Sequence, residues 1–173
     1  MPLLGQGRNV SPRMQTYVDD WLLANGWSQG GGGSSGPVTE NFATSSSLPA
    51  GFVSTGDAPW FVQGTTFYST PHAAESGSIG DNQVSTLIFS RDALTPSNTI
   101  SFRYKTSTEN GYDKLKFYIN NVFVDEWSGD SGGFQVYTTA CVAGLNTFEW
   151  RYVKDVSTAG LADTVWIDNI VIS

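Results

Sequence analysis

The sequence contains one cysteine and one histidine, and each shortage excludes a class of protein. Cys141 cannot form an intramolecular disulfide or an all-cysteine metal site, so we expect it to be a small buried apolar side chain. His72 lies in a polar loop near Glu75. No serine in a strained turn accompanies it, which excludes the usual serine hydrolase arrangement.

Other catalytic patterns are also missing. Glu109, Asp113, Asp125 and Glu126 are expected at turns or at outward-facing positions, and not as the two inward carboxylates that a glycosidase requires. The segment GGGGSSG lacks the lysine and the strand-to-helix context of a phosphate-binding loop. We therefore expect that the protein is not an enzyme.

Basic residues are scarce, with 9 Lys and Arg against 16 Asp and Glu, which gives a net charge of -7. This balance argues against nucleic acid as the main ligand, because phosphates require clustered cations. No apolar run is long enough to cross a membrane, and the first residues do not resemble a secretory signal. We expect a chain that stays in the cytoplasm where it is made until something else releases it.

The N-terminal segment 1–29 is predicted to form an extended arm and one amphipathic helix. Ser11 and Pro12 begin the helix and Gly26 ends it. Its apolar stripe consists of Met14, Tyr17, Val18, Trp21 and Leu22. Because the Gly/Ser linker 30–37 follows, the stripe is expected to dock on another protein or on a second copy. The alternative is that the helix folds back onto its own chain.

From residue 38 onward the chain is a series of short β segments separated by turns. The clearest alternation is in FEWRY, where Phe148, Trp150 and Tyr152 face one way and Glu149 and Arg151 the other. Further strands are expected in VTENFA, SLPAGFV, WFVQ, TTFYS, QVSTLIFS, SNTISFRYKTS, DKLKFYI, VFVDEWSG, GFQVYTTACV and TVWIDNIVI.

The pair Asn120-Asn121 between two of these segments predicts a two-residue hairpin turn, because asparagine tolerates positive φ. Strands at this spacing, with no convincing helix among them, predict an all-β antiparallel sandwich over 38–173.

The order ENF…LPAGF…SGSIGDNQVSTL…ISFRYKTSTENGYDKLKFYIN…EWSG…GLNTFEWRYVKD…GLADTVWIDNIVI resembles the MAM-like and cleaved-adhesin-like domains of bacterial surface and secreted proteins. The resemblance covers about residues 38 to 173. It implies a two-sheet jelly roll used for adhesion, carbohydrate binding or assembly, without catalysis.

Asp168 lies in the apolar strand TVWIDNIVI, where a carboxylate is costly unless it is satisfied. The resemblance implies a structural calcium ion where the first and last strands meet, with Glu40 and Asp168 as ligands. Calcium takes six to eight oxygens, so other groups would have to complete the site. The alternative is that Asp168 accepts hydrogen bonds from backbone amides and pins the strand ends.

Aromatic residues make up 13% of the chain, and an exposed ring would suit the apolar face of a sugar. Trp60, Tyr112, Trp127 and Tyr137 are candidates because they lie beside turns. The alternative for most of these side chains is packing in the core or at its rim.

Two functions remain. In the first, the N-terminal helix anchors the chain to a capsid or other virion protein of a bacteriophage, and the jelly roll is displayed on the particle as a decoration or fibre-type protein. In the second, the chain is a carbohydrate-binding or adhesin module of an extracellular bacterial protein. The initial methionine favours the first. Deleting residues 1–29 separates them, because only the first needs that segment.

Overall fold

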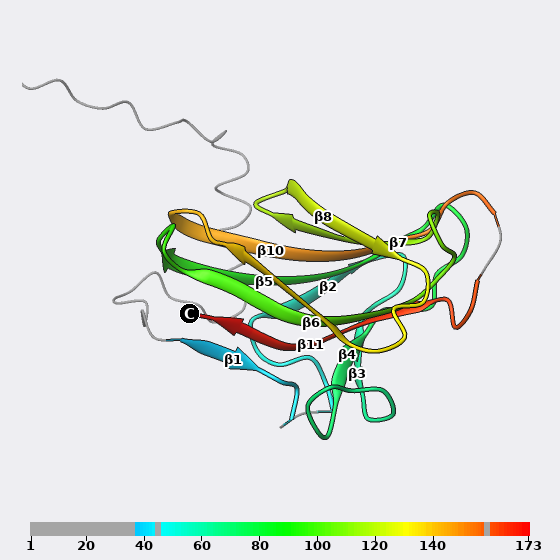
Figure 1. The fold of residues 1–173 in the computed structure, drawn as a ribbon, viewed down its shortest axis with the longest axis horizontal. Coiled ribbons are helices and arrows are strands. Elements are labelled where there is room, and N and C mark those ends of the chain that lie inside the picture. Colours follow the sequence, from blue (N-terminus) through cyan, green and yellow to red (C-terminus); the bar gives the residue numbers. More distant parts are fainter. Residues whose placement is uncertain (1–36, 44–45, 158–159) are drawn as a thin grey trace, which may run out of the picture. The chain divides into compact units, whose positions relative to one another are not determined.

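The computed structural model describes residues 37–43, 46–157 and 160–173. These residues fall in one compact unit, Ser35–Ser173, whose regular elements are all strands. The strands form two antiparallel sheets that pack face to face (Figure 1). The predicted helix and its linker, except for Pro37, lie outside the described residues. Within the described part, no helix is long and apolar enough to cross a membrane.

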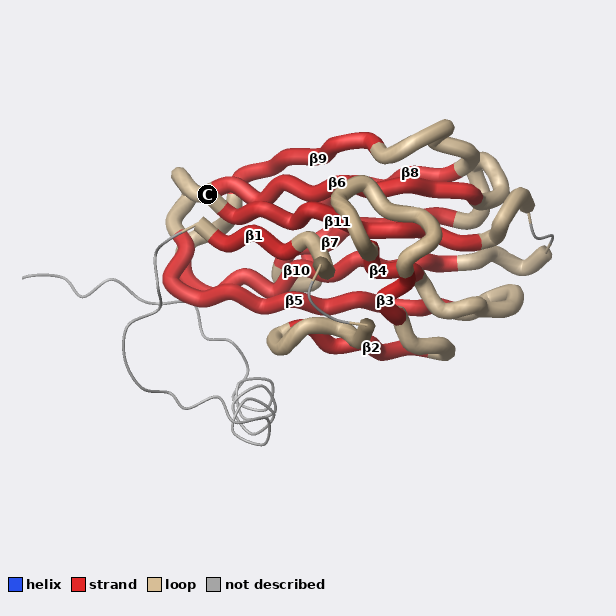
Figure 2. The backbone as a smooth tube through the Cα atoms, turned by 90° about the horizontal axis from the view of Figure 1, so that it is seen from below, coloured by secondary structure: helices blue, strands red, loops and turns tan. Residues whose placement is uncertain are grey.

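The first sheet, sheet A, has six strands in the order β3-β4-β11-β6-β9, with β1 paired to β11 as well. Its strands are β1 (Val38–Glu40), β3 (Phe61–Gln63), β4 (Ala73–Glu75), β6 (Thr99–Ser107), β9 (Gln135–Ala140) and β11 (Thr164–Ile172). The short strands β1 and β4 pair with different parts of β11, so the C-terminal strand lies inside the sheet (Figure 2).

The second sheet, sheet B, has five strands in the order β2-β5-β10-β7-β8. Its strands are β2 (Phe52–Gly56), β5 (Val84–Leu94), β7 (Lys114–Ile119), β8 (Val122–Ser128) and β10 (Gly144–Val153). The strand β10 lies at its centre. Nearest neighbours in both sheets are antiparallel, as the sequence predicted for a jelly-roll sandwich.

The core lies between the two sheets and confirms the predicted alternation of β10. Phe148, Trp150 and Tyr152 are completely buried. Across the interface, the rings of Phe102 and Phe117 have centroids 4.8 Å apart. Each large apolar side chain buried in this way contributes roughly 1.5–3 kcal/mol of transfer free energy. Cys141 is also buried and free, as expected.

The hairpin between β7 and β8 has the predicted turn. Asn120 and Asn121 have φ values of 52° and 61°, the left-handed region that a two-residue turn requires. The Asn120 amide side chain also donates to the Leu145 carbonyl at 3.0 Å and accepts from the Thr147 amide at 2.7 Å. The turn is therefore fastened to the neighbouring end of β10.

A β-bulge interrupts the pairing of β7 with β8. Phe117 is opposite Asp125, but the next residue, Tyr118, is opposite Phe123, so Val124 is an extra residue on β8. Because Phe117 faces the core and Tyr118 faces outward, the bulge places Phe123 on the outer face beside Tyr118. Phe123 is 51% exposed there.

Two of the strand predictions are wrong. The segment TTFYS is a loop, because the backbone amides of Tyr68 and Ser69 donate to the Asp168 carboxylate and not to a strand. Conversely, residues 73–75, expected within a loop, form β4, which pairs with both β3 and β11. A three-residue strand is too short for its alternation to be recognised in the sequence.

Candidate functional site

The outer face of sheet B carries a row of large side chains that crosses all five strands. The row follows successive cross-strand partners. Its members are Phe123, Tyr118, Glu149, Ile88 and Val53. With neighbouring strands about 4.8 Å apart, this aromatic row is about 19 Å long. It therefore offers an extended, largely apolar strip with one carboxylate in its middle.

A second row runs parallel to the first, two residues further along β2, β5, β7 and β10. Its members are Glu126, Lys116, Arg151, Thr86 and Thr55. This charged row is made of hydrogen-bonding side chains. The two rows together form one surface, which we call the platform, with rings and aliphatic groups beside donors and acceptors.

Contacts at the centre of the platform fix its side chains. The guanidinium carbon of Arg151 lies 3.9 Å from the centroid of the Tyr118 ring. Nε and Nη2 of Arg151 donate to Glu149 Oε2 at 2.9 and 2.6 Å, and Nη2 also donates to Asn121 Oδ1 at 2.6 Å. The ring of Phe123 meets that of Tyr118 edge to face, at 5.7 Å. These contacts hold Tyr118, Glu149 and Arg151 against one another without a ligand.

This arrangement has the chemistry of a sugar-binding surface. An exposed ring such as Phe123 packs against the C–H face of a pyranose, and fixed polar groups satisfy its hydroxyls. The sequence analysis placed Glu149 and Arg151 on the outer face of their strand but did not single out Tyr118 or Phe123. For Tyr118 the alternation in KFYI was a usable signal, whereas for Phe123 the bulge removed it.

The four aromatic residues predicted to bind a ligand have different surroundings. Trp60 is only 2% exposed and packs in the core, so it offers no ring face to a ligand, which corrects that prediction. Tyr112 is 60% exposed in the loop between β6 and β7. Neither of them lies on the platform strands.

Trp127 and Tyr137 do come together, with ring centroids 4.9 Å apart, where β8 of one sheet faces β9 of the other. Both are partly buried against the core, and Trp127 also stacks on Tyr104 at 4.3 Å. Burial, and then the charge of Asp125, raise the pKa of both Tyr104 and Tyr137. These rings close one edge of the sandwich, as the packing alternative expected.

Asp168 is completely buried and is satisfied by three backbone amides. Its Oδ2 accepts from Tyr68 and Ser69 at 2.8 and 2.7 Å, and its Oδ1 accepts from Asn169 at 2.6 Å. These are the contacts that the amide alternative describes, although the amides belong to the loop after β3 as well as to β11. Burial raises the pKa of Asp168, the amides oppose that rise, and the charge of Glu40 adds to it.

Glu40 ends β1 opposite Ile170, on the strand that also carries Asp168. Its Oε1 accepts from the Phe42 amide at 2.5 Å. The two carboxylates are therefore close enough to interact, as a shared ion would require. Most of the acceptor capacity of Asp168 is already used by amides, and two carboxylates are fewer ligands than calcium takes. The calcium site thus stays a prediction.

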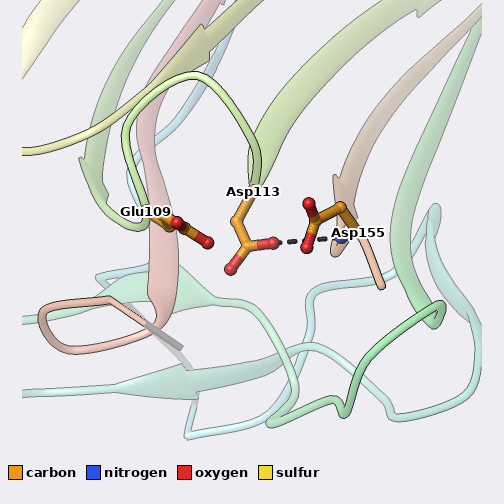
Figure 3. A group of neighbouring side chains, drawn as sticks. All are labelled: Glu109, Asp113 and Asp155. Carbon is orange, nitrogen blue, oxygen red and sulfur yellow. Dashed lines mark hydrogen bonds between the residues drawn. The ribbon is translucent and has the colours of Figure 1, made fainter. Parts of the chain in front are cut away.

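A different acidic group lies at the end of the sandwich. Glu109, Asp113 and Asp155 bring carboxylate oxygens within 4.8 Å of one another (Figure 3). Asp113 lies in the bend before β7, as expected, but its side chain is completely buried. Its Oδ1 accepts from the Asp155 amide and its Oδ2 from Lys154 Nζ, both at 3.1 Å.

Lys154 is the cation that makes this burial tolerable. Its ammonium group also donates to Asp163 Oδ1 at 2.5 Å, where the Tyr152 hydroxyl donates as well. Burial lowers the pKa of Lys154, but the hydrogen bonds and charges of Asp163 and Asp113 outweigh burial and raise it. The network ties the end of β10 to the start of β7 and to the loop before β11, which is a structural role.

Comparison with solved structures gives similarity in fold at low sequence identity. The K1 cleaved adhesin domain of Lys-gingipain from Porphyromonas gingivalis W83 matches with a TM-score of 0.60 and 14% identity, over 80% of this chain and 98% of that domain. The xylan-binding domain of Xyn10C from Paenibacillus barcinonensis matches with a TM-score of 0.53 and 12% identity, over 78% and 91%.

The secreted serine protease VesC from Vibrio cholerae matches with a TM-score of 0.52 and 14% identity, over 66% of this chain and 24% of that protein. No protein-family model matches the sequence, and no curated protein matches it significantly. The resemblance inferred from the sequence is therefore confirmed at the level of the fold: the described residues form a cleaved-adhesin-like jelly roll, a fold that carbohydrate-binding modules share.

Proposed function

We propose that this protein is a non-catalytic glycan-binding module that binds its ligand on the platform of sheet B and acts outside the cell. The observation that carries the proposal is the pair of rows described above. Phe123 and Tyr118 supply rings, and Arg151, Glu149 and Asn121 supply fixed hydrogen-bonding groups beside them. The row is long enough for several consecutive sugars of a polysaccharide.

Similarity in fold supports this proposal. Among the structures with the same fold, one is named as a xylan-binding domain and another is a complex with β-1,4-galactotriose. Fold alone does not assign function, so the argument rests on the platform residues. The virion-protein hypothesis has no corresponding support, and the segment on which it depends lies outside the described residues.

Binding to a panel of soluble polysaccharides tests the proposal. Affinity electrophoresis in gels that contain xylan, galactan, glucan or polygalacturonate would identify a ligand, and isothermal titration would measure its Kd. We expect Phe123→Ala to weaken binding about tenfold or more, because the ring loses roughly 1.5–3 kcal/mol of apolar burial.

Tyr112→Ala is the matched control, since it removes another exposed ring from a different part of the surface. Both variants should melt at the wild-type temperature. If no polysaccharide slows the migration of the protein in the gel, or if Phe123→Ala binds as tightly as the wild type, the platform is not a glycan site.

A further inference from the structure

The outward positions of β7, β8 and β10, which include the charged residues of the platform and Lys114 beside them, differ in net charge from the whole chain. On the outward positions of β7, β8 and β10 the cations are Lys114, Lys116 and Arg151, and the carboxylates are Glu126 and Glu149. Three cations against two carboxylates leave a net charge of +1. The complete chain has a net charge of -7, so cations are concentrated beside the exposed rings.

Two of these cations are direct cross-strand neighbours. Lys116 on β7 and Arg151 on β10 are partners in the register, and like charges at such positions are destabilising. An anion placed between them would remove that cost. The sheet therefore presents two cationic side chains side by side in the charged row, with the Arg151 guanidinium extending over Tyr118.

The carboxylates nearby neutralise these cations unequally. Glu149 forms an ion pair with Arg151 at 2.6 Å, and Glu126 forms its shorter ion pair with Lys114. The ammonium group of Lys116 lies 3.7 Å from Glu126, and its side chain is 30% exposed. Lys116 is thus the cation of the platform that is least neutralised and still open to a ligand.

The distance between the rows suits an acidic sugar. Tyr118 and Lys116 are two residues apart on one face of β7, which separates them by about 6.6 Å along the strand. A pyranose that packs on the aromatic row would place a ring substituent over the charged row. A carboxylate or sulfate substituent would there meet Lys116 and Arg151, whereas a hydroxymethyl group would bring no charge to either cation.

We infer that the ligand of the platform is an anionic glycan, whose acidic groups are bound between Lys116 and Arg151. This inference rests on the proposed function and specifies the class of glycan. Because the contact is between charges near the surface, binding should weaken as salt rises.

The experiment compares probes that differ only in charge. Titrations with polygalacturonate and its methyl ester test a uronate, and dextran sulfate and dextran test a sulfate ester. Each is repeated at two salt concentrations. We expect one acidic probe to bind at least about tenfold more tightly than its neutral partner, with a difference that shrinks in high salt.

Variants assign the effect to Lys116. Lys116→Gln should weaken binding of the acidic probe roughly tenfold without changing the neutral one, and Glu126→Gln should strengthen it, because it frees the lysines. Lys105→Gln is the control: this cation lies over Trp166 in sheet A and should have no effect. Equal affinity for charged and neutral probes, with the ring of Phe123 still required, would overturn the inference and leave the proposed function intact. Failure of every probe and every neutral polysaccharide would overturn both.

Discussion

Lys154 and Asp113 form an ion pair of 3.1 Å in which the two side chains are only 2% and 0% exposed. Such a pair is tolerated in an apolar interior only when each charge has its partner. Here the pair joins the end of β10 to the beginning of β7, and Asp163 shares the same ammonium group. The end of the sandwich therefore depends on one buried cation.

Lys154→Met should destabilise the fold strongly. The substitution keeps much of the side-chain volume but leaves the Asp113 carboxylate buried without a cation, which costs about 3–5 kcal/mol of unfolding free energy. Urea denaturation measures this loss. The double variant Lys154→Met/Asp113→Asn should recover part of it, since the uncompensated charge is gone. A single variant as stable as the wild type would show that water reaches Asp113.

The same pair predicts a loss of stability at high pH. The folded-state pKa of Lys154 is raised above its ordinary value of 10.5, so its contribution is complete below that pH and is lost as pH rises through the higher folded value. Burial and then Asp163 raise the pKa of Tyr152 as well, so this hydroxyl stays protonated in that window. The stability difference between wild type and Lys154→Met should be constant from neutral pH to about pH 10 and fall above it. A difference that does not change would contradict the shift.

Arg151→Met should weaken the fold as well as glycan binding. The Glu149 side chain is 13% exposed and would lose its charge partner, at a cost of about 1–3 kcal/mol. The double variant with Glu149→Gln should restore most of the stability but not the binding. Denaturation of the four proteins gives the coupling energy of the pair. Additive effects would mean that the two side chains do not interact in solution.

Asp168→Ala should release the loop after β3. Without the carboxylate the amides of Tyr68 and Ser69 have no acceptor from this side chain, so their hydrogen exchange should accelerate. We expect a loss of about 1.5–3 kcal/mol for hydrogen bonds to a charged group. Asp57→Ala is the comparison, because Asp57 accepts the Val84 amide at an exposed site and should cost less. Unchanged exchange at Tyr68 would show that other contacts hold the loop.

Calcium is tested by its removal. If Glu40 and Asp168 share an ion, a chelator should lower the melting temperature of the wild type, and added calcium should restore it. Asp168→Asn should be insensitive to both treatments. If the wild type melts at the same temperature with chelator and with calcium, this pair binds no structural calcium. Asp168 then only accepts hydrogen bonds from the backbone amides.

The sequence predicted the parts of the fold in which local pattern and burial agree. The alternation around Trp150 and the Asn120-Asn121 turn are both local properties, and both are confirmed. The strand β4 escaped prediction because only pairing with neighbours on both sides makes three residues a strand. The segment TTFYS looked like a strand because aromatic and β-branched residues favour one, but Asp168, about 100 residues away, takes its amides.

The candidate site was less predictable than the fold. Proximity to a turn selected Trp60, but nothing local shows that this residue, which lies just before β3, packs in the core. Trp127 and Phe123 are four residues apart on one strand and would share a face if the strand were regular. They face opposite sides of the sheet because of the bulge at Val124, and no local feature of VFVDEW predicts that bulge.

That bulge has a consequence for how such surfaces are remodelled. If β8 kept a strict two-residue period from Trp127 onward, Val124 would lie opposite Tyr118 and Phe123 would turn toward the interior, while the strands of the other sheet kept their pairing. Whether one extra residue at an edge is accommodated as a bulge thus decides which side chain fills the interior and which meets a ligand. Sandwiches with the same interior can in this way acquire different specificities without rebuilding their central strands.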